Sequence, residues 1–332
     1  MYSAEIRSAV FENDSNTVAL ATSFGFAIYS LSETNKTKPQ STNLLKNPSF
    51  PKGARLISTL GNSNIIALTP YTDKPNCVYI FETFSTSNSG DNHELAMCNF
   101  DEDVCGIRLR PDILVVATHK KISVRQLSDF TEIASFTTAF NVDGIFDIPA
   151  TFSSSLLAFP SPDIGVVSVC NYLDSSVRTI NVHAFKTPVS FIKFSENGRL
   201  LAVAGDDGKA IIVYSVPSMK QVAFLRRGIT GSKLLSMSFE PHGTQLAVTS
   251  MNGTLHVFFI AWAESVTEQD PKSPSRAAIK LKDLDTHTSW VCFSAKTLKL
   301  CGITNSGQPF IVVFDDQMKQ ASLDMKEKLV FS

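Results

Sequence analysis

Short β-type segments recur along this chain at nearly constant intervals. Seven tetrapeptides rich in Val, Ile, Phe and Tyr can be laid under one another, with their third residues at positions 28, 80, 124, 169, 213, 257 and 313. The spacings are 52, 44, 45, 44, 44 and 56 residues. A period in the mid-forties is typical of β-propeller blades, in which each repeat supplies one small sheet.

Each repeated segment is preceded by a second apolar strand, and turn residues such as Asp206-Asp207-Gly208 and Asn252-Gly253 stand between the two. A further strand is readable before this pair, as in 189–194, and an outer strand after it, as in 221–224. Four strands in each of seven repeats predict an all-β, WD40-like seven-bladed β-propeller that occupies residues 1–332 as a single domain. Both chain ends, 1–11 and 321–331, are candidates for the strand that closes the ring.

Three stretches interrupt the repeat, at 33–53, 85–94 and 261–276, and they explain its two wide spacings. Their content of Ser, Thr, Asn, Lys and Pro predicts surface loops.

The composition limits the possible partners. With 43% hydrophobic residues and a formal net charge of −1, the chain is expected to fold around a sizeable core and to lack a basic field for nucleic acid. No apolar run is long enough to span a bilayer, and the first residues have no apolar signal core, so a cytoplasmic protein is expected. The six cysteines and six histidines show no metal-ligand spacing, which predicts reduced thiols, no metal and no cofactor.

Two adjacent arginines followed by glycine, Arg226-Arg227-Gly228, stand between strand-like runs in a charge-poor region. If this segment is extended, successive side chains point to opposite sides, so the two guanidinium groups would serve two separate pockets. The planar fork of a guanidinium suits phosphate oxygens, and glycine lets the backbone turn or approach a ligand closely. Without further context, however, such a pair is more often a solvated surface feature.

Within the repeat, Leu225-Arg226-Arg227-Gly228 falls after the outer strand of blade five and before the first strand of blade six. In this motif the sequence resembles the PROPPIN family of seven-bladed propellers that bind polyphosphoinositides. The resemblance covers essentially the whole chain and is strongest over 181–259, for example in Tyr214-Ser215-Val216-Pro217. It implies two rim pockets, one on each side of the arginine pair, for phosphatidylinositol 3-phosphate and phosphatidylinositol 3,5-bisphosphate.

On the blade-six side, the resemblance places the Ser, Thr and His of the family on Ser250, Thr254 and His256. Arg227 is the expected cation of this pocket, and Lys233 is expected to assist it. Hydroxyls and an imidazole add hydrogen bonds to phosphate oxygens whose charge the guanidinium balances. Taken without the resemblance, Thr254 and His256 read as ordinary strand residues that face outward.

On the blade-five side the sequence departs from the family pattern. Phe185 stands where the family has histidine, and Gly205, Lys209 and Ile212 stand where it has Ser, Thr and Arg. His183 lies two residues before Phe185, on the same face of an extended strand, and can substitute for the missing imidazole. We therefore expect a weakened or altered pocket, built from four residues with His183 as a substitute: Arg226, Lys186, Thr187 and Lys209.

The resemblance also implies a loop of blade six that dips into the membrane, here 261 to about 282. Its expected membrane contacts are Trp262, Lys272 and Arg276, since aromatic and basic side chains suit a lipid interface. The acids Glu264 and Glu268 count against insertion.

The sequence thus predicts a non-enzymatic propeller that associates peripherally with autophagosomal precursor, endosomal or vacuolar membranes and recruits autophagy or trafficking proteins there. The alternative is a scaffold that binds proteins and has little use for lipid, the most general role of propellers. An enzyme is not expected, because the chain has no Gly-x-Ser-x-Gly, His-Glu-x-x-His or Gly-x-x-x-x-Gly-Lys motif.

Overall fold

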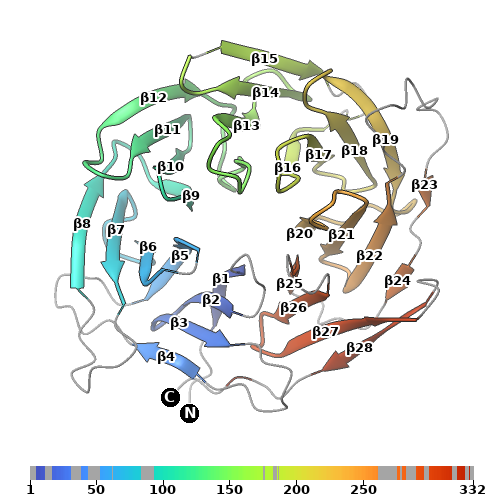
Figure 1. Cartoon of the computed structure of the whole chain (residues 1–332), viewed down its shortest axis with the longest axis horizontal. Coiled ribbons are helices and arrows are strands. Elements are labelled where there is room, and N and C mark those ends of the chain that lie inside the picture. Colours follow the sequence, from blue (N-terminus) through green and yellow to red (C-terminus); the bar gives the residue numbers. More distant parts are fainter. Residues whose placement is uncertain are drawn as a thin grey trace.

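The computed structural model describes most of the chain. The described residues are 5–11, 17–30, 39–43, 53–61, 63–83, 93–174, 176–181, 185, 187–260, 275–276, 279–281, 289–294, 299–315, 320–325 and 329. They form seven small sheets arranged as a ring (Figure 1), antiparallel apart from the pairing of one short strand in blade five. This architecture confirms the predicted all-β propeller.

Four of the sheets contain four strands that are consecutive in the chain. They are blade one, β1 (Ile6–Phe11), β2 (Thr17–Thr22), β3 (Gly25–Ser30) and β4 (Pro39–Asn43); blade two, β5 (Ala54–Thr59), β6 (Ile65–Pro70), β7 (Cys77–Glu82) and β8 (His93–Asn99); blade three, β9 (Val104–Leu109), β10 (Ile113–Thr118), β11 (Lys121–Gln126) and β12 (Glu132–Thr137); and blade seven, β25 (Ser289–Phe293), β26 (Leu300–Thr304), β27 (Pro309–Phe314) and β28 (Ala321–Met325).

The three remaining blades depart from this plan. They are blade four, β13 (Leu156–Pro160), β14 (Val166–Asn171) and β15 (Ser176–Asn181); blade five, β16 (Val189–Phe194), β17 (Leu200–Gly205), β18 (Ala210–Ser215), β19 (Lys220–Arg226) and β23 (Ser275–Arg276); and blade six, β20 (Leu234–Phe239), β21 (Gln245–Ser250), β22 (Thr254–Phe259) and β24 (Ile279–Leu281).

Two expectations need correction here. Blade four has three strands rather than four, and its innermost position is held only by an isolated bridge between Asp147 and Ala158. None of the three predicted surface loops is a loop throughout, because β4 lies within 33–53, β8 begins at His93 within 85–94, and β23 lies within 261–276. The polar composition of these stretches is compatible with an outer strand, which has one sheet edge in solvent.

The core of the molecule lies between the blades rather than within them. The buried apolar side chains of the described residues fall into seven clusters, and each cluster joins two neighbouring sheets. Strands β2, β10 and β17 are buried along their full length because a blade covers each of their faces. The ring is therefore one cooperative unit.

Polar side chains on innermost strands add hydrogen bonds from one blade to the next. The Ser58 hydroxyl accepts a bond from the backbone N–H of Leu109 at 2.9 Å, and the Asp147 carboxylate accepts one from the backbone N–H of Phe194 at 2.8 Å. Ser236 bonds the backbone N–H of Val291 at 3.1 Å in the same way. These bonds satisfy backbone donors that have no partner strand on the channel side.

Among the described strands, the ring closes without exchange of a strand between the first and last blades. Strand β1 pairs with β2, and β28 pairs with β27, so each candidate closing strand stays in its own blade. Blades one and seven meet instead through an apolar cluster that includes Ile6, Val18, Ile303 and Leu329.

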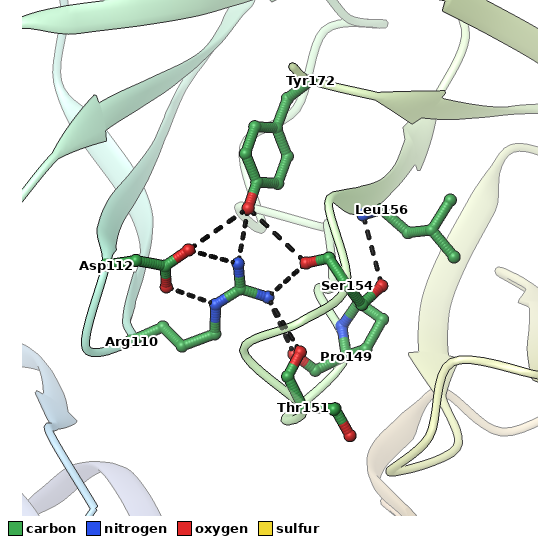
Figure 2. A network of polar contacts seen from close by, with 7 residues as sticks. All are labelled: Arg110, Asp112, Pro149, Thr151, Ser154, Leu156 and Tyr172. Carbon is green, nitrogen blue, oxygen red and sulfur yellow. Dashed lines mark hydrogen bonds and ion pairs between the residues drawn. The ribbon is translucent and has the colours of Figure 1, made fainter. Parts of the chain in front are cut away.

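A buried arginine joins blades three and four (Figure 2). Arg110 is 4% exposed and forms a bidentate ion pair with Asp112, with both N···O distances at 2.7 Å. Its guanidinium also donates to the carbonyl of Ser154 at 2.7 Å and to the hydroxyl of Tyr172. Burial lowers the pKa of Arg110, but the bonds to Asp112 and Tyr172 outweigh burial and raise it.

The innermost strands of six blades, together with residues 143–150 that precede blade four, surround a central channel of about 800 Å³. Its wall carries the buried carboxylate of Asp147, which lies 3.3 Å from Lys193 Nζ and 3.7 Å from Arg108 Nε. Lys233 and Asp143 also line this channel and form an ion pair at 2.9 Å.

Candidate anion-binding site on the rim

The arginine pair lies where outer strand β19 ends. Register places Arg226 opposite Ala210, and Leu225 opposite Ile211. Leu225 and Ile211 belong to the core cluster shared with blade six, whereas Ala210 packs against the cluster shared with blade four. Because side chains alternate along a strand, Arg226 lies on the blade-four face and Arg227 on the blade-six face. The register thus agrees with opposite directions for the two arginines, and the two separate pockets stay a prediction.

Arg227 is buried between blades five and six, with 7% of its surface exposed. Its Nε donates to the carbonyl of Gly208 at 2.6 Å, one terminal nitrogen donates to Ser250 Oγ at 2.7 Å, and the other donates to the carbonyl of Ser232 at 3.1 Å. These bonds use three of the five N–H donors of a guanidinium. Two N–H groups are left for an anion.

Burial also acts on the charge of this arginine. It lowers the pKa of Arg227, and the nearby carboxylate of Asp207 offsets part of that effect. An arginine nevertheless keeps its proton at neutral pH. The buried cation between blades five and six is therefore permanent.

Three polar side chains lie on the sheet face that Arg227 contacts. Ser250 pairs directly with Thr254, and His256 follows two residues later on the same face of β22. All three are buried, so the alternative interpretation of outward-facing strand residues is wrong for Thr254 and His256. Ser250 Oγ lies 2.9 Å from Thr254 Oγ1, and the ring of His256 stacks on Phe258.

The sequence analysis did not identify two residues of this cluster, Asn252 and Gly208. Thr254 Oγ1 donates to Asn252 Oδ1 at 2.8 Å, so the amide of Asn252 joins the two hydroxyls. Gly208 has a left-handed φ of 54°, and a Cβ there would lie 2.1 Å from the carbonyl oxygen of Ser232. Both positions belong to hairpin turns, where the Asp-Gly and Asn-Gly signals indicated a turn but not its contacts.

The opposite side of the arginine pair is apolar. Phe185 and Ile212 are buried in the core shared with blade four. A Cβ on Gly205 would lie 2.8 Å from Thr187 Oγ1 and 3.0 Å from Phe185 Cγ. The phenyl ring therefore occupies the space next to residue 205, and Gly205 is the residue type that leaves room for it. Arg226 is exposed above this surface.

Two lysines do not lie where the sequence interpretation put them. Lys209 is a turn residue whose Cε would be 3.6 Å from a Cβ on Gly231, so it lies beside the loop toward blade six rather than in the blade-five-side pocket. Lys233 forms its ion pair with Asp143, a residue of the connection between blades three and four. The structure thus directs this ammonium group toward the central channel and away from Arg227.

Several expected site residues lie outside the described residues, namely His183, Lys186, Trp262 and Lys272. The backbone of Arg276 pairs with that of Arg226 in parallel register, which brings one end of the predicted membrane loop to the rim beside the arginine pair. The loop is also shorter than predicted, since 279–281 form the outer strand β24 of blade six.

The described residues contain no group of three or more His, Cys, Asp or Glu side chains arranged to hold a metal ion. In the same part of the chain, no helix has the length and apolar character that crossing a bilayer requires. Burial raises the pKa of the Cys170 thiol to about 12 and that of Cys301 to about 11, which makes both thiols poor nucleophiles.

The fold and the site together define a seven-bladed β-propeller with an arginine pair on its rim between blades five and six. The PROPPIN family model matches residues 6–289, and the chain belongs to that family.

Known relatives agree with this assignment. Autophagy-related protein 18 of Caenorhabditis elegans is 28% identical over 222 residues, which are 66% of this chain and 52% of the relative. The chain thus spans about half the length of that protein. Autophagy-related protein 18 of Yarrowia lipolytica is 25% identical over 301 residues, covering 83% of this chain and 71% of the relative.

Solved structures share the fold. Hsv2 of Kluyveromyces lactis with a complete loop 6CD has a TM-score of 0.78 at 17% identity, with 99% of this chain and 100% of that chain covered. The complex of KlAtg21 with the coiled coil of AgAtg16 gives a TM-score of 0.78 at 16% identity, with 96% and 98% covered.

Proposed function

We propose that this chain binds phosphatidylinositol 3-phosphate and phosphatidylinositol 3,5-bisphosphate through Leu225-Arg226-Arg227-Gly228. The observation that carries the proposal is the buried face of Ser250, Thr254 and His256 beneath Arg227. A permanent cation with two further N–H donors, next to two hydroxyls, is chemically suited to phosphate oxygens.

In this mechanism the two arginines act differently. Arg227 is held by protein acceptors on three sides, so it offers a headgroup a donor pair whose direction is already fixed. Arg226 is exposed and attracts the anionic membrane surface at longer range.

The blade-six side is the stronger of the two proposed sites. On the blade-four face, Phe185 packs next to Gly205 and Ile212 replaces a cation, so Arg226 and Thr187 are the polar groups that remain among the described residues. One effective headgroup site makes avidity with other membrane contacts more important for stable binding.

The cellular role follows from the family. We infer that the chain is a cytoplasmic, peripherally associated scaffold, without catalytic activity, that brings autophagy or trafficking proteins to phosphoinositide-marked membranes of autophagosomal precursors, endosomes or vacuoles. The autophagy-related names of its relatives and the coiled-coil complex of KlAtg21 support this setting.

The proposal is tested by co-sedimentation with phosphatidylcholine vesicles that contain either lipid. Arg226→Thr combined with Arg227→Thr is expected to abolish binding. Thr254→Val removes one hydroxyl at nearly constant volume and is expected to weaken binding roughly tenfold, because a hydrogen bond to a charged group is lost.

Thr187→Val is the matched variant on the other face and should weaken binding less than Thr254→Val does. Binding of the double arginine variant at wild-type strength would refute the lipid function. Equal losses for Thr254→Val and Thr187→Val would refute the single strong site.

A protein-binding scaffold with little lipid affinity is the second candidate. A crevice of about 370 Å³ between blades three and four favours it, because the crevice is lined by the exposed side chains of Phe152, Ile133 and Leu173. Wild-type protein that fails to sediment with either vesicle would favour this candidate.

A further inference from the structure

One short loop crosses the surface between the hairpins of blades five and six. It runs from Gly228 to Lys233 and is tied at both sides: Ser232 N–H donates to the carbonyl of Asp207 at 3.0 Å, and Met251 N–H donates to the carbonyl of Lys233 at 3.0 Å. Asn252 N–H donates to Ser232 Oγ at 3.2 Å. The end of this loop at Ser232 and Lys233 is therefore held against both hairpins.

This loop holds an apolar side chain out in solvent. Ile229 is 83% exposed, the highest value among the exposed large hydrophobic side chains of the described residues. Met251, in the adjoining hairpin, is 48% exposed. Neither residue belongs to any of the seven apolar clusters. The fold does not use these two side chains for its own core.

The charges around this pair favour a lipid surface as its partner. The exposed cations Arg226 and Lys209 belong to the same rim segment, and Arg227 lies beneath the loop. The acids of this segment are Asp206 and Asp207, of which Asp207 is engaged with Lys209 through a backbone hydrogen bond and an ion pair at 3.9 Å. Aliphatic side chains bordered by cations match the interface of an anionic bilayer.

We propose that Ile229 and Met251 insert into the lipid interface when the neighbouring Arg227 pocket holds a headgroup. This inference rests on the proposed function and adds a membrane anchor outside the blade-six loop 261–282. The anchor is pre-ordered, because its loop is already hydrogen bonded to both hairpins, so binding costs little conformational entropy.

The test compares Ile229→Ser combined with Met251→Ser against a control of matched exposure. The control is Ile164→Ser combined with Phe24→Ser, whose side chains are 73% and 49% exposed in the hairpins of blades four and one. On phosphatidylcholine vesicles that contain phosphatidylinositol 3-phosphate, the first variant should bind about tenfold more weakly, or more, because burial of two apolar side chains is lost. The control should bind as wild type does.

Soluble inositol 1,3-bisphosphate separates the two proposals in the same experiment. Calorimetric titration should give equal affinity for wild type and the Ile229 and Met251 variant, since the headgroup pocket is unchanged. Wild type that binds neither the soluble headgroup nor vesicles would refute the proposed function. Wild type that binds vesicles no better than the Ile229 and Met251 variant would refute only the anchor, and a protein partner would then be the occupant of this surface.

A second measurement reports insertion directly. Ile229→Trp adds one indole to the two native tryptophans, and brominated phosphatidylcholine in the same vesicles should quench its emission beyond the quenching seen for wild type. Quenching equal to that of wild type would contradict insertion of residue 229.

Discussion

Replacing Arg227 by alanine removes three hydrogen bonds that hold the hairpin of blade five, the loop before blade six and Ser250 together. Each such bond contributes roughly 1 kcal/mol net, so the sum is about 3 kcal/mol. Release of a buried cation from its desolvated site offsets part of this loss. We expect the free energy of unfolding to fall by about 2–3 kcal/mol.

The exposed neighbour provides the comparison. Arg226→Ala removes a side chain that lies on the surface, and such substitutions usually change stability by less than about 0.5 kcal/mol. Arg227→Lys keeps the charge but not the three-way fork, and its stability should lie between those of wild type and Arg227→Ala.

Urea unfolding followed by circular dichroism measures these differences as shifts of the midpoint at constant slope. An Arg227→Ala midpoint equal to that of wild type would show that Arg227 does not hold blades five and six together. Equal losses of stability for Arg227→Ala and Arg226→Ala would also contradict this role. The result also affects how lipid binding by the double arginine variant is interpreted. Replacing Arg227 is expected to lower both stability and lipid binding, whereas replacing Arg226 is expected to leave stability nearly unchanged.

Three further predictions concern the structure around the ring. Arg110→Gln should lower the free energy of unfolding by about 3 kcal/mol, because it leaves the buried acceptors at the junction of blades three and four without their cation. Urea unfolding measures this loss, and Lys121→Gln is the control, since Lys121 is exposed in its ion pair with Glu132 and its loss should therefore cost less. Burial raises the pKa of the Asp112 carboxyl, but the bonds and charge of Arg110 outweigh burial and hold this pKa below its usual value. The carboxylate therefore stabilises the fold above its unfolded pKa of about 4, and this contribution disappears as the pH falls through the lower folded value. Asp112→Asn should flatten the loss of thermal stability in that acid range, and an unchanged pH profile would contradict the assignment. Gly205→Ser should destabilise the wild-type protein, because the Cβ of residue 205 would lie 3.0 Å from Phe185 Cγ. The loss of stability should be much smaller when Phe185 is replaced by alanine, and additive losses in this double-mutant cycle would show that the two positions are independent.

The sequence predicted the blade positions because the features that define a blade are local. Each repeat of about 44 residues contains hairpin turns such as 206–209 and strands that alternate or stay apolar throughout. These local signals determine where each blade begins and ends. Strand β4 and the incomplete blade four were harder to predict. The outer strand is polar like a loop, and the bridge at Asp147 is a single pair of residues without a strand pattern.

For the site, alternation along β19 was enough to predict opposite directions for Arg226 and Arg227. Two lysines, Lys209 and Lys233, were assigned to the pockets through the family resemblance rather than through alternation, and the structure places both elsewhere. Lys209 lies in a turn, where alternation does not hold, and Lys233 pairs with Asp143, which is 90 residues away in the sequence. Contacts across the central channel leave no periodic signal in the chain.

The manner of ring closure has a consequence for how the protein is made. In the described sheets every blade consists of neighbouring segments of the chain, apart from the short strand β23 that returns to blade five. Each blade is therefore complete soon after its own residues leave the ribosome, and none waits for a strand from the far end of the chain. Each new blade can therefore fold against the preceding blade during synthesis. The last step of folding is then the packing of blade seven against blade one at the cluster that includes Ile303 and Leu329.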